Sequence, residues 1–283
     1  MYKISFAVPR CLSDGNNYFS DYLSLEKTTS IKGIFILLIL FSHCANSLVL
    51  KDNIFNSAYS VFMNIMGQSV VVMFLFYSGY GVMLSAVRKG QTYVKRIPYK
   101  RIFKTLYHFI IAVLLYLILQ TAFGKTYSLT HILLSMIGWE SIGNSNWYIF
   151  VILSLYLLSY AALSICKNKP KAAVALMFLL TGALIVVLYY TKRDAFWWDT
   201  AICYPLGMLY FVLQDKVEYL MNKRKGYWWI SFIALLILFA VTGLFRVYPI
   251  NSILNHAIYA LGVLLFTMQV QVHNKILCFF GIF

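Results

Sequence analysis

The sequence predicts an all-α fold, a polytopic transmembrane bundle of about eight helices with both termini on the cytosolic side. Hydrophobic residues make up 61% of the 283 residues and charged residues only 12%. Soluble chains carry roughly a quarter charged residues and under half apolar ones. The mean hydropathy is +0.74. Because so apolar a chain lacks the polar residues to cover itself in water, we expect it to be embedded in lipid.

The number of helices follows from the apolar runs, which need about 20 residues to cross a hydrocarbon core about 30 Å thick. Seven runs approach this length, and an eighth, residues 196–214, is shorter and contains Pro205 and Gly207. Its Trp197 and Trp198 are typical of the membrane–water interface, so we count it as a span. The eight runs are residues 32–50, 66–87, 102–123, 147–166, 171–191, 196–214, 227–246 and 252–272.

The basic residues indicate how these spans are oriented. Of the 24 Lys and Arg residues, 19 fall on one side when the runs alternate across the membrane. Such residues accumulate on the cytosolic side, which places the N-terminus inside. The net charge of +15 would also suit nucleic acid, but this loop-by-loop distribution favours a topological role and no nucleic-acid partner. The five basic residues left on the outer side are Lys51, Lys125, Lys192, Arg193 and Arg246.

The polar beginning of the chain differs from the rest. Residues 1–31 have mixed charge and no short apolar stretch followed by a cleavage site, so we expect a cytosolic N-terminal segment without a removable signal peptide. Residues 32–283 are expected to form the transmembrane domain.

The first span contains two ionisable residues on one face. Lys32 and His43 are eleven residues apart, which is three helical turns plus about 20°, and about 16 Å along the axis. With Lys32 at the cytosolic edge, His43 lies near the middle of the bilayer. An ionisable group at that depth is costly and is commonly functional. The alternative is a neutral histidine that is hydrogen-bonded to a neighbouring helix.

The second span brings a serine to a similar depth. Ser78 is ten residues before Arg88, or about 15 Å above the cytosolic boundary, so the small, polar stretch 78–81 can face His43. Close helix packing is the alternative explanation, because Gly81 and Ser85 form a small-xxx-small pair.

The densest basic stretch, residues 93–104, follows the second span. It can bind a polyanionic cytosolic ligand such as the phosphates of coenzyme A, for which Arg offers bidentate geometry. A topological signal that contacts lipid headgroups is the alternative, and the two roles are compatible. The four candidate phosphate ligands are Lys95, Arg96, Lys100 and Arg101.

These elements, in this order, resemble the integral-membrane acyltransferase-3 family, which O-acylates bacterial polysaccharides and other glycans. The resemblance covers roughly residues 25–283. In that family a basic residue, ten intervening residues and His open the first span, as Lys32 and His43 do here, although Arg is common where this chain has Lys. The family's Phe-Phe-x-x-Ser-Gly element appears with Leu75 in place of the second Phe. The other matching segments are residues 93–104, Asn146-Trp147-Tyr148 with Tyr156 downstream, and residues 205–208.

The resemblance implies a function. It implies transfer of an acyl group, with acetyl expected, from cytosolic acyl-CoA to a hydroxyl of a cell-surface glycan or lipid-linked saccharide. His43 is then the general base or a transient acyl carrier, while Lys32 places the donor and Ser78 orients the imidazole or the reacting oxygen. Asn146 and Trp147 would contact the sugar at the outer end. We expect no metal and no tightly bound cofactor, and a multi-pass location in the bacterial cytoplasmic membrane.

Two alternatives stay open. A transporter or flippase for a glycan-related solute would use a mid-membrane histidine to couple proton movement, although the spans contain no paired carboxylates and no evident inverted repeat. An inactive remnant is the other, because family members usually continue with further helices beyond the point where this chain stops at Phe283. On that reading the domain lacks its last one or two helices.

Overall fold

The computed structural model describes residues 3–6, 17–47, 54–167, 169–192, 194–245 and 247–282. Helices dominate these residues, as predicted for an all-α membrane protein. The chain divides into two compact units, and the boundaries between them fall inside α3 (Ser69–Val94) and α8 (Cys203–Lys223). The first unit comprises the chain up to Tyr77 and from Leu213 onward, and the second comprises Ser78–Val212.

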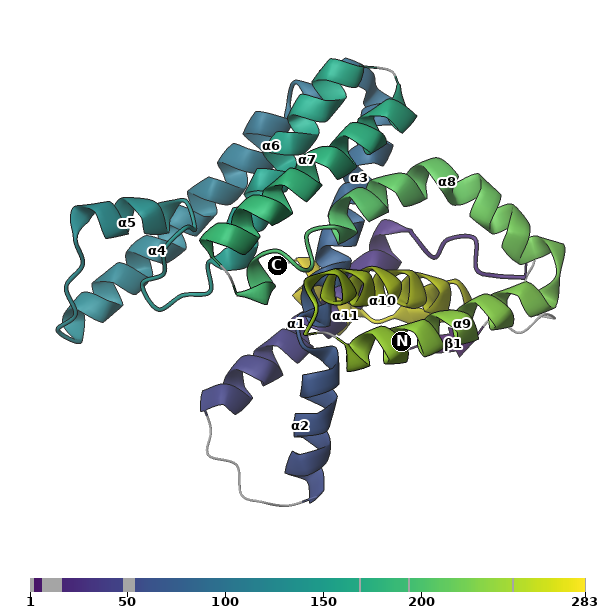
Figure 1. Cartoon of the computed structure of the whole chain (residues 1–283), viewed down its shortest axis with the longest axis horizontal. Coiled ribbons are helices and arrows are strands. Elements are labelled where there is room, and N and C mark those ends of the chain that lie inside the picture. The colour runs from purple at the N-terminus through teal and green to yellow at the C-terminus, as the bar shows by residue number, and fades with distance from the viewer. Residues whose placement is uncertain are drawn as a thin grey trace. The chain divides into compact units, whose positions relative to one another are not determined.

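The first unit contains two helix pairs, one formed by α1 and α11 and the other by α9 and α10 (Figure 1). A short two-stranded antiparallel ribbon joins β1 to β2, with Lys3 opposite His273. The prediction did not anticipate this ribbon. Besides its parts of α3 and α8, the described elements of this unit are β1 (Lys3–Phe6), α1 (Leu25–Ser47), α2 (Ile54–Met66), α9 (Lys225–Leu244), α10 (Pro249–Gln269), β2 (Val270–His273) and α11 (Lys275–Ile282).

Two glycines allow α1 and α11 to approach closely. A Cβ added at Gly33 would collide with the carbonyl oxygen of Leu277, and one added at Gly281 would collide with the carbonyl oxygen of Thr29. Beside this crossing, the Ser30 hydroxyl and the Cys278 thiol are 3.0 Å apart. The crossing at Gly33 therefore fixes the position of α1 next to Lys32, the preceding residue.

In the second unit α6 and α7 pack side by side (Figure 1), and α6 also contacts η1 and α4. Proline at the first position of α7 suits a helix start, because that N–H would have no intrahelical partner. Apart from its shares of α3 and α8, this unit comprises η1 (Pro98–Phe103), α4 (Lys104–Ala122), α5 (Leu129–Met136), α6 (Trp147–Cys166), α7 (Pro170–Thr191) and η2 (Ala195–Trp197).

Six of the described helices are long and apolar enough to cross a membrane, and each overlaps a predicted span. They are residues 69–94, 98–122, 147–166, 170–191, 226–244 and 249–269. The first predicted span, 32–50, falls on α1 up to Ser47, and its residues 48–50 lie outside the described residues. The count of eight spans and the N-in, C-in orientation stay predictions.

The sixth predicted span begins later than expected. Residues 195–197 form a short 3₁₀ turn, and α8 begins at Cys203 and continues to Lys223, beyond the predicted end at 214. Pro205 accounts for this start, because proline is tolerated in the first turn of a helix but not in its interior. The run 196–214 is therefore only partly helical, and α8 is not among the six described helices that are long and apolar enough to cross a membrane, so its role as a span stays a prediction.

Candidate functional site

A polar cluster in the second unit joins three elements around Tyr156 of α6. The Tyr156 hydroxyl donates a hydrogen bond to Oγ of Ser78 on α3, at 3.5 Å. The guanidinium carbon of Arg101 on η1 lies 5.7 Å from the centre of the Tyr156 ring, within cation–π range. Ser78 and Arg101 were predicted from separate motifs, and the structure brings them to the same tyrosine. All three residues belong to helices that are long and apolar enough to cross a membrane.

A second layer of polar groups supports Tyr156. The hydroxyl of Ser159, one turn further along α6, donates a 2.9 Å hydrogen bond to the Tyr204 hydroxyl on α8. The rings of Tyr156 and Tyr204 meet edge to face with centres 6.0 Å apart. Ser159 and Tyr204 are completely buried. Buried polar groups are costly unless they are hydrogen-bonded, so the Ser159–Tyr204 hydrogen bond fixes the position of the Tyr204 ring. The Tyr204 ring in turn holds the Tyr156 ring in a defined place.

The approach of α8 to α3 depends on Gly79. A Cβ at this position would collide with the carbonyl oxygen of Tyr204, so only glycine leaves room for α8. The Ser-Gly pair therefore has two roles: Ser78 meets Tyr156, and Gly79 admits the backbone that carries Tyr204. Sequence reasoning missed Tyr204 and Ser159, which look like ordinary residues of apolar runs. The nearby Pro205-Leu-Gly segment was the available signal.

The basic stretch contains a π-helix, η1, and its basic residues differ in exposure. In η1 the Lys104 amide donates to the carbonyl of Tyr99, five residues back, instead of the four of an α-helix. Arg101 is half-buried against Tyr156, whereas Lys95, Arg96 and Lys100 are exposed. Of the four predicted phosphate ligands, one therefore joins the polar cluster and three face outward. Single π-turns occur frequently at functional sites.

A pocket opens where α3 and α6 end and α7 begins, with an empty volume of about 580 Å³. Gly90 interrupts α3 here with φ 58° and ψ −152°, a conformation that favours glycine. The amide of Gln91 donates to the carbonyl of Leu163 at 3.4 Å, and Lys167 lines the opening. Leu163 lies seven residues after Tyr156 on α6, so the pocket is about 10 Å along the helix from the polar cluster. In the predicted orientation it is at the cytosolic end.

Lys32 and His43 lie on α1, which is one continuous helix from Leu25 to Ser47. The spacing argument that places them on one face therefore applies. Lys32 is half-buried and His43 is exposed. They belong to the first unit and Ser78 belongs to the second, so the proximity of His43 to Ser78 stays a prediction.

Asn146 and Trp147 begin α6 at its predicted outer end. The Asn146 side-chain amide is buried and donates a 2.9 Å hydrogen bond to the carbonyl of Gly138. Asn146 thus ties the preceding loop to the helix. The Trp147 ring is half-buried and lies 5.8 Å from that of Phe196.

Beside this loop a lysine is enclosed by aromatic rings. Nζ of Lys192 donates to the carbonyl of Trp139 at 2.6 Å and lies 4.0 Å from the centre of its ring. The ring of Trp197 is 4.7 Å away, and the carboxylate of Glu140 is 3.7 Å away. The enclosed lysine holds the 139–140 loop to the end of α7.

Comparison with known protein families decides the kind of protein. The acyltransferase-3 family model, described as an acyltransferase domain, matches residues 29–278. The chain belongs to this family. The family model and the apolar helices together identify this acyltransferase-3 protein as a membrane acyltransferase. No curated protein and no solved structure matches the chain.

Proposed function

We propose that this acyltransferase-3 protein is an O-acyltransferase that moves an acyl group, with acetyl expected, from cytosolic acyl-CoA to a hydroxyl of a cell-surface glycan or glycolipid. The observation that carries the proposal is the contact of Ser78 and Arg101 with Tyr156, within helices of an acyltransferase that are long and apolar enough to cross a membrane. Polar and cationic groups within a membrane are costly and are usually functional.

The proposed chemistry is attack of the acceptor hydroxyl on the thioester carbonyl. His43 takes the hydroxyl proton as general base, since a histidine imidazole is the side chain that most often accepts and returns a proton in general acid–base catalysis. The new ester bond forms, the carbon–sulfur bond breaks, and the thiolate of coenzyme A leaves and is protonated. Acyl transfer through His43 as a covalent carrier has the same overall balance.

The polar cluster is proposed to stabilise the oxyanion that develops on the thioester oxygen. A preorganised hydroxyl and a guanidinium in a water-poor site are suited to that charge, and loss of one such donor costs roughly a hundredfold or more in rate. Tyr156 and Ser78 supply hydroxyls, and Arg101 supplies the positive charge.

The donor is proposed to enter from the cytosolic side. Lys95, Arg96 and Lys100 are exposed and free to meet its phosphates, while Lys32 positions the thioester end below His43. The pocket beside Gln91 and Lys167 offers space at the same predicted end of the second unit. At the outer end, Trp147 is the proposed contact for the sugar, and Asn146 would act by fixing the adjacent loop.

The test uses membranes that contain the full chain, incubated with radiolabelled acetyl-CoA. We expect label in an envelope glycan with the wild type, none with His43→Ala, and strongly reduced label with Arg101→Gln. Lys125→Gln is the matched control, because Lys125 is an exposed basic residue of a predicted outer loop. Full transfer by correctly inserted His43→Ala would refute the role of His43. Proton-driven solute uptake without any donor would favour a transporter instead.

A further inference from the structure

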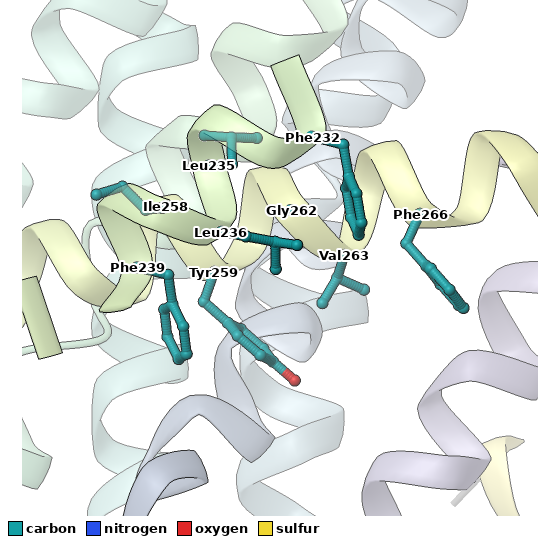
Figure 2. Close-up of a pocket in the computed structure, with 9 residues that line it drawn as sticks. All are labelled: Phe232, Leu235, Leu236, Phe239, Ile258, Tyr259, Gly262, Val263 and Phe266. Atoms are coloured by element: carbon teal, nitrogen blue, oxygen red, sulfur yellow. The ribbon is translucent and has the colours of Figure 1, made fainter. Parts of the chain in front are cut away.

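An apolar groove lies along the α9–α10 helix pair in the first unit (Figure 2). Its empty volume is about 520 Å³, and none of the residues that line it carries a charge. The side chains of Phe232, Leu236 and Phe239 reach it from α9, and Tyr259 and Phe266 reach it from α10. None of these residues takes part in the proposed acyl transfer.

The groove is bracketed by hydrogen bonds that hold the two helices together. Toward one end, the Trp228 indole donates to the carbonyl of Leu265 at 2.8 Å. Toward the other, the Asn255 amide donates to the carbonyl of Phe239 at 2.8 Å and to the Thr242 hydroxyl at 2.9 Å. Between these ties the groove is lined by aliphatic and aromatic side chains and by Gly262. The ties keep the groove from collapsing or widening.

A glycine leaves the middle of the groove open. Gly262 lines it, and a Cβ added there would meet no atom within 4 Å. Aromatic pairs lie on either side: Phe232 and Phe266 have ring centres 6.5 Å apart, and Phe239 and Tyr259 have ring centres 5.6 Å apart. Phe232 and Phe239 are seven residues apart, so the open stretch is about 10 Å long. This length suits a segment of a single extended alkyl chain.

The surroundings of the groove limit what can occupy it. Residues 226–244 and 249–269 each meet the length and hydropathy of a membrane span, and the groove is formed by the middle of both. It therefore lies at the depth of the hydrocarbon core, where water and charged ligands are excluded. An unfilled groove there would forfeit dispersion contacts with its lining.

We propose that this groove binds one hydrocarbon chain of a membrane lipid. The chain is held between the two aromatic pairs and over Gly262, and it exchanges more slowly than the lipid around the other spans. The site depends on shape, because lipid tails are as apolar as the lining and gain no hydrophobic free energy by entering.

The experiment uses the full chain in bilayer nanodiscs with a phospholipid that carries a photoreactive diazirine in its acyl chain. After irradiation, mass spectrometry of peptides should place adducts preferentially in the α9 and α10 segments that line the groove. Gly262→Leu fills the groove from α10, and Leu236→Phe fills it from α9. Both should reduce these adducts several-fold.

Gly182→Leu is the matched control, because Gly182 lies within the α7 span and also has open space at its Cβ position. We expect it to leave the α9–α10 adducts unchanged. Adducts spread evenly over the exposed faces of α4, α7 and α9 would overturn the proposal, since they indicate surrounding lipid only. Absence of adducts from the groove in the wild type would also overturn it, since another part of the protein would then cover the groove.

Discussion

Replacing Lys192 by Met removes one ammonium group from the aromatic enclosure at the end of α7. Methionine keeps an unbranched side chain of similar length, so the packing against Trp139 and Trp197 is largely retained. What is lost is the hydrogen bond to the Trp139 carbonyl, the two cation–π contacts and the ion pair with Glu140. The substitution therefore measures the contribution of the charge.

The expected cost follows from these contacts. A hydrogen bond from a charged donor contributes about 1.5–3 kcal/mol, and each cation–π contact about 1 kcal/mol. The ion pair adds less than about 1 kcal/mol, because the Glu140 side chain is 38% exposed and its charge is screened. Since one ammonium makes all these contacts, their energies do not simply add. We expect Lys192→Met to destabilise the protein by about 3 kcal/mol.

Thermal unfolding of the purified protein in detergent provides the assay. At about 2 °C per kcal/mol for a chain of this size, Tm should fall by about 6 °C. The matched control is Lys125→Met, which removes an exposed lysine and should leave Tm nearly unchanged. Glu140→Gln should lower Tm only slightly. Equal Tm values for the two lysine variants would refute the reasoning, because they would show that the enclosed charge contributes no stability.

Two further predictions concern the first unit. Gly281→Ala should lower Tm markedly, because its methyl group would collide with the Thr29 carbonyl. Gly226→Ala is the control and should leave Tm unchanged, because a Cβ there meets no atom within 4 Å. Thermal unfolding of both variants checks this. Burial, a hydrogen bond to Glu218 and that residue's negative charge raise the pKa of Tyr18 above its ordinary value near 10. The stability that the protonated Tyr18 hydroxyl contributes is present below about pH 10 and is lost as the pH rises further. Tyr18→Phe should therefore be less stable than wild type near neutral pH, and it should lose less stability than wild type above pH 10. A steeper alkaline loss in Tyr18→Phe would contradict this.

The spans could be predicted from the sequence because lipid imposes a local requirement of length and apolarity. The predicted run 147–166 coincides with α6 for this reason. The run 196–214 was less reliable, because Phe196 and Trp197 are apolar enough to extend it although they form a short 3₁₀ turn. Hydropathy indicates whether a segment can lie in a membrane. Whether its backbone is helical also depends on single residues such as Pro205.

The candidate site was predictable only in part, because it depends on contacts between helices. Ser78 and Arg101 were recognised from their motifs, but their common partner Tyr156 follows from the packing of α3, α6 and η1. Ser159 and Tyr204 are 45 residues apart, and nothing in their local sequence indicates that they pair. Lys100 and Arg101 were treated alike, and only the geometry of the π-turn separates them.

The π-turn at Pro98–Phe103 has a consequence for how related sequences should be aligned. A π-turn accommodates one residue more than an α-turn, so deletion of a single residue here would restore ordinary α-helical geometry. Every side chain on one side of the deletion would then rotate by about 100° relative to the other. Arg101 would no longer contact the Tyr156 ring, and the side chain of an adjacent residue would point toward that ring instead. A gap placed within these six residues therefore changes which cation reaches the interior, even where the basic composition of the segment is unchanged.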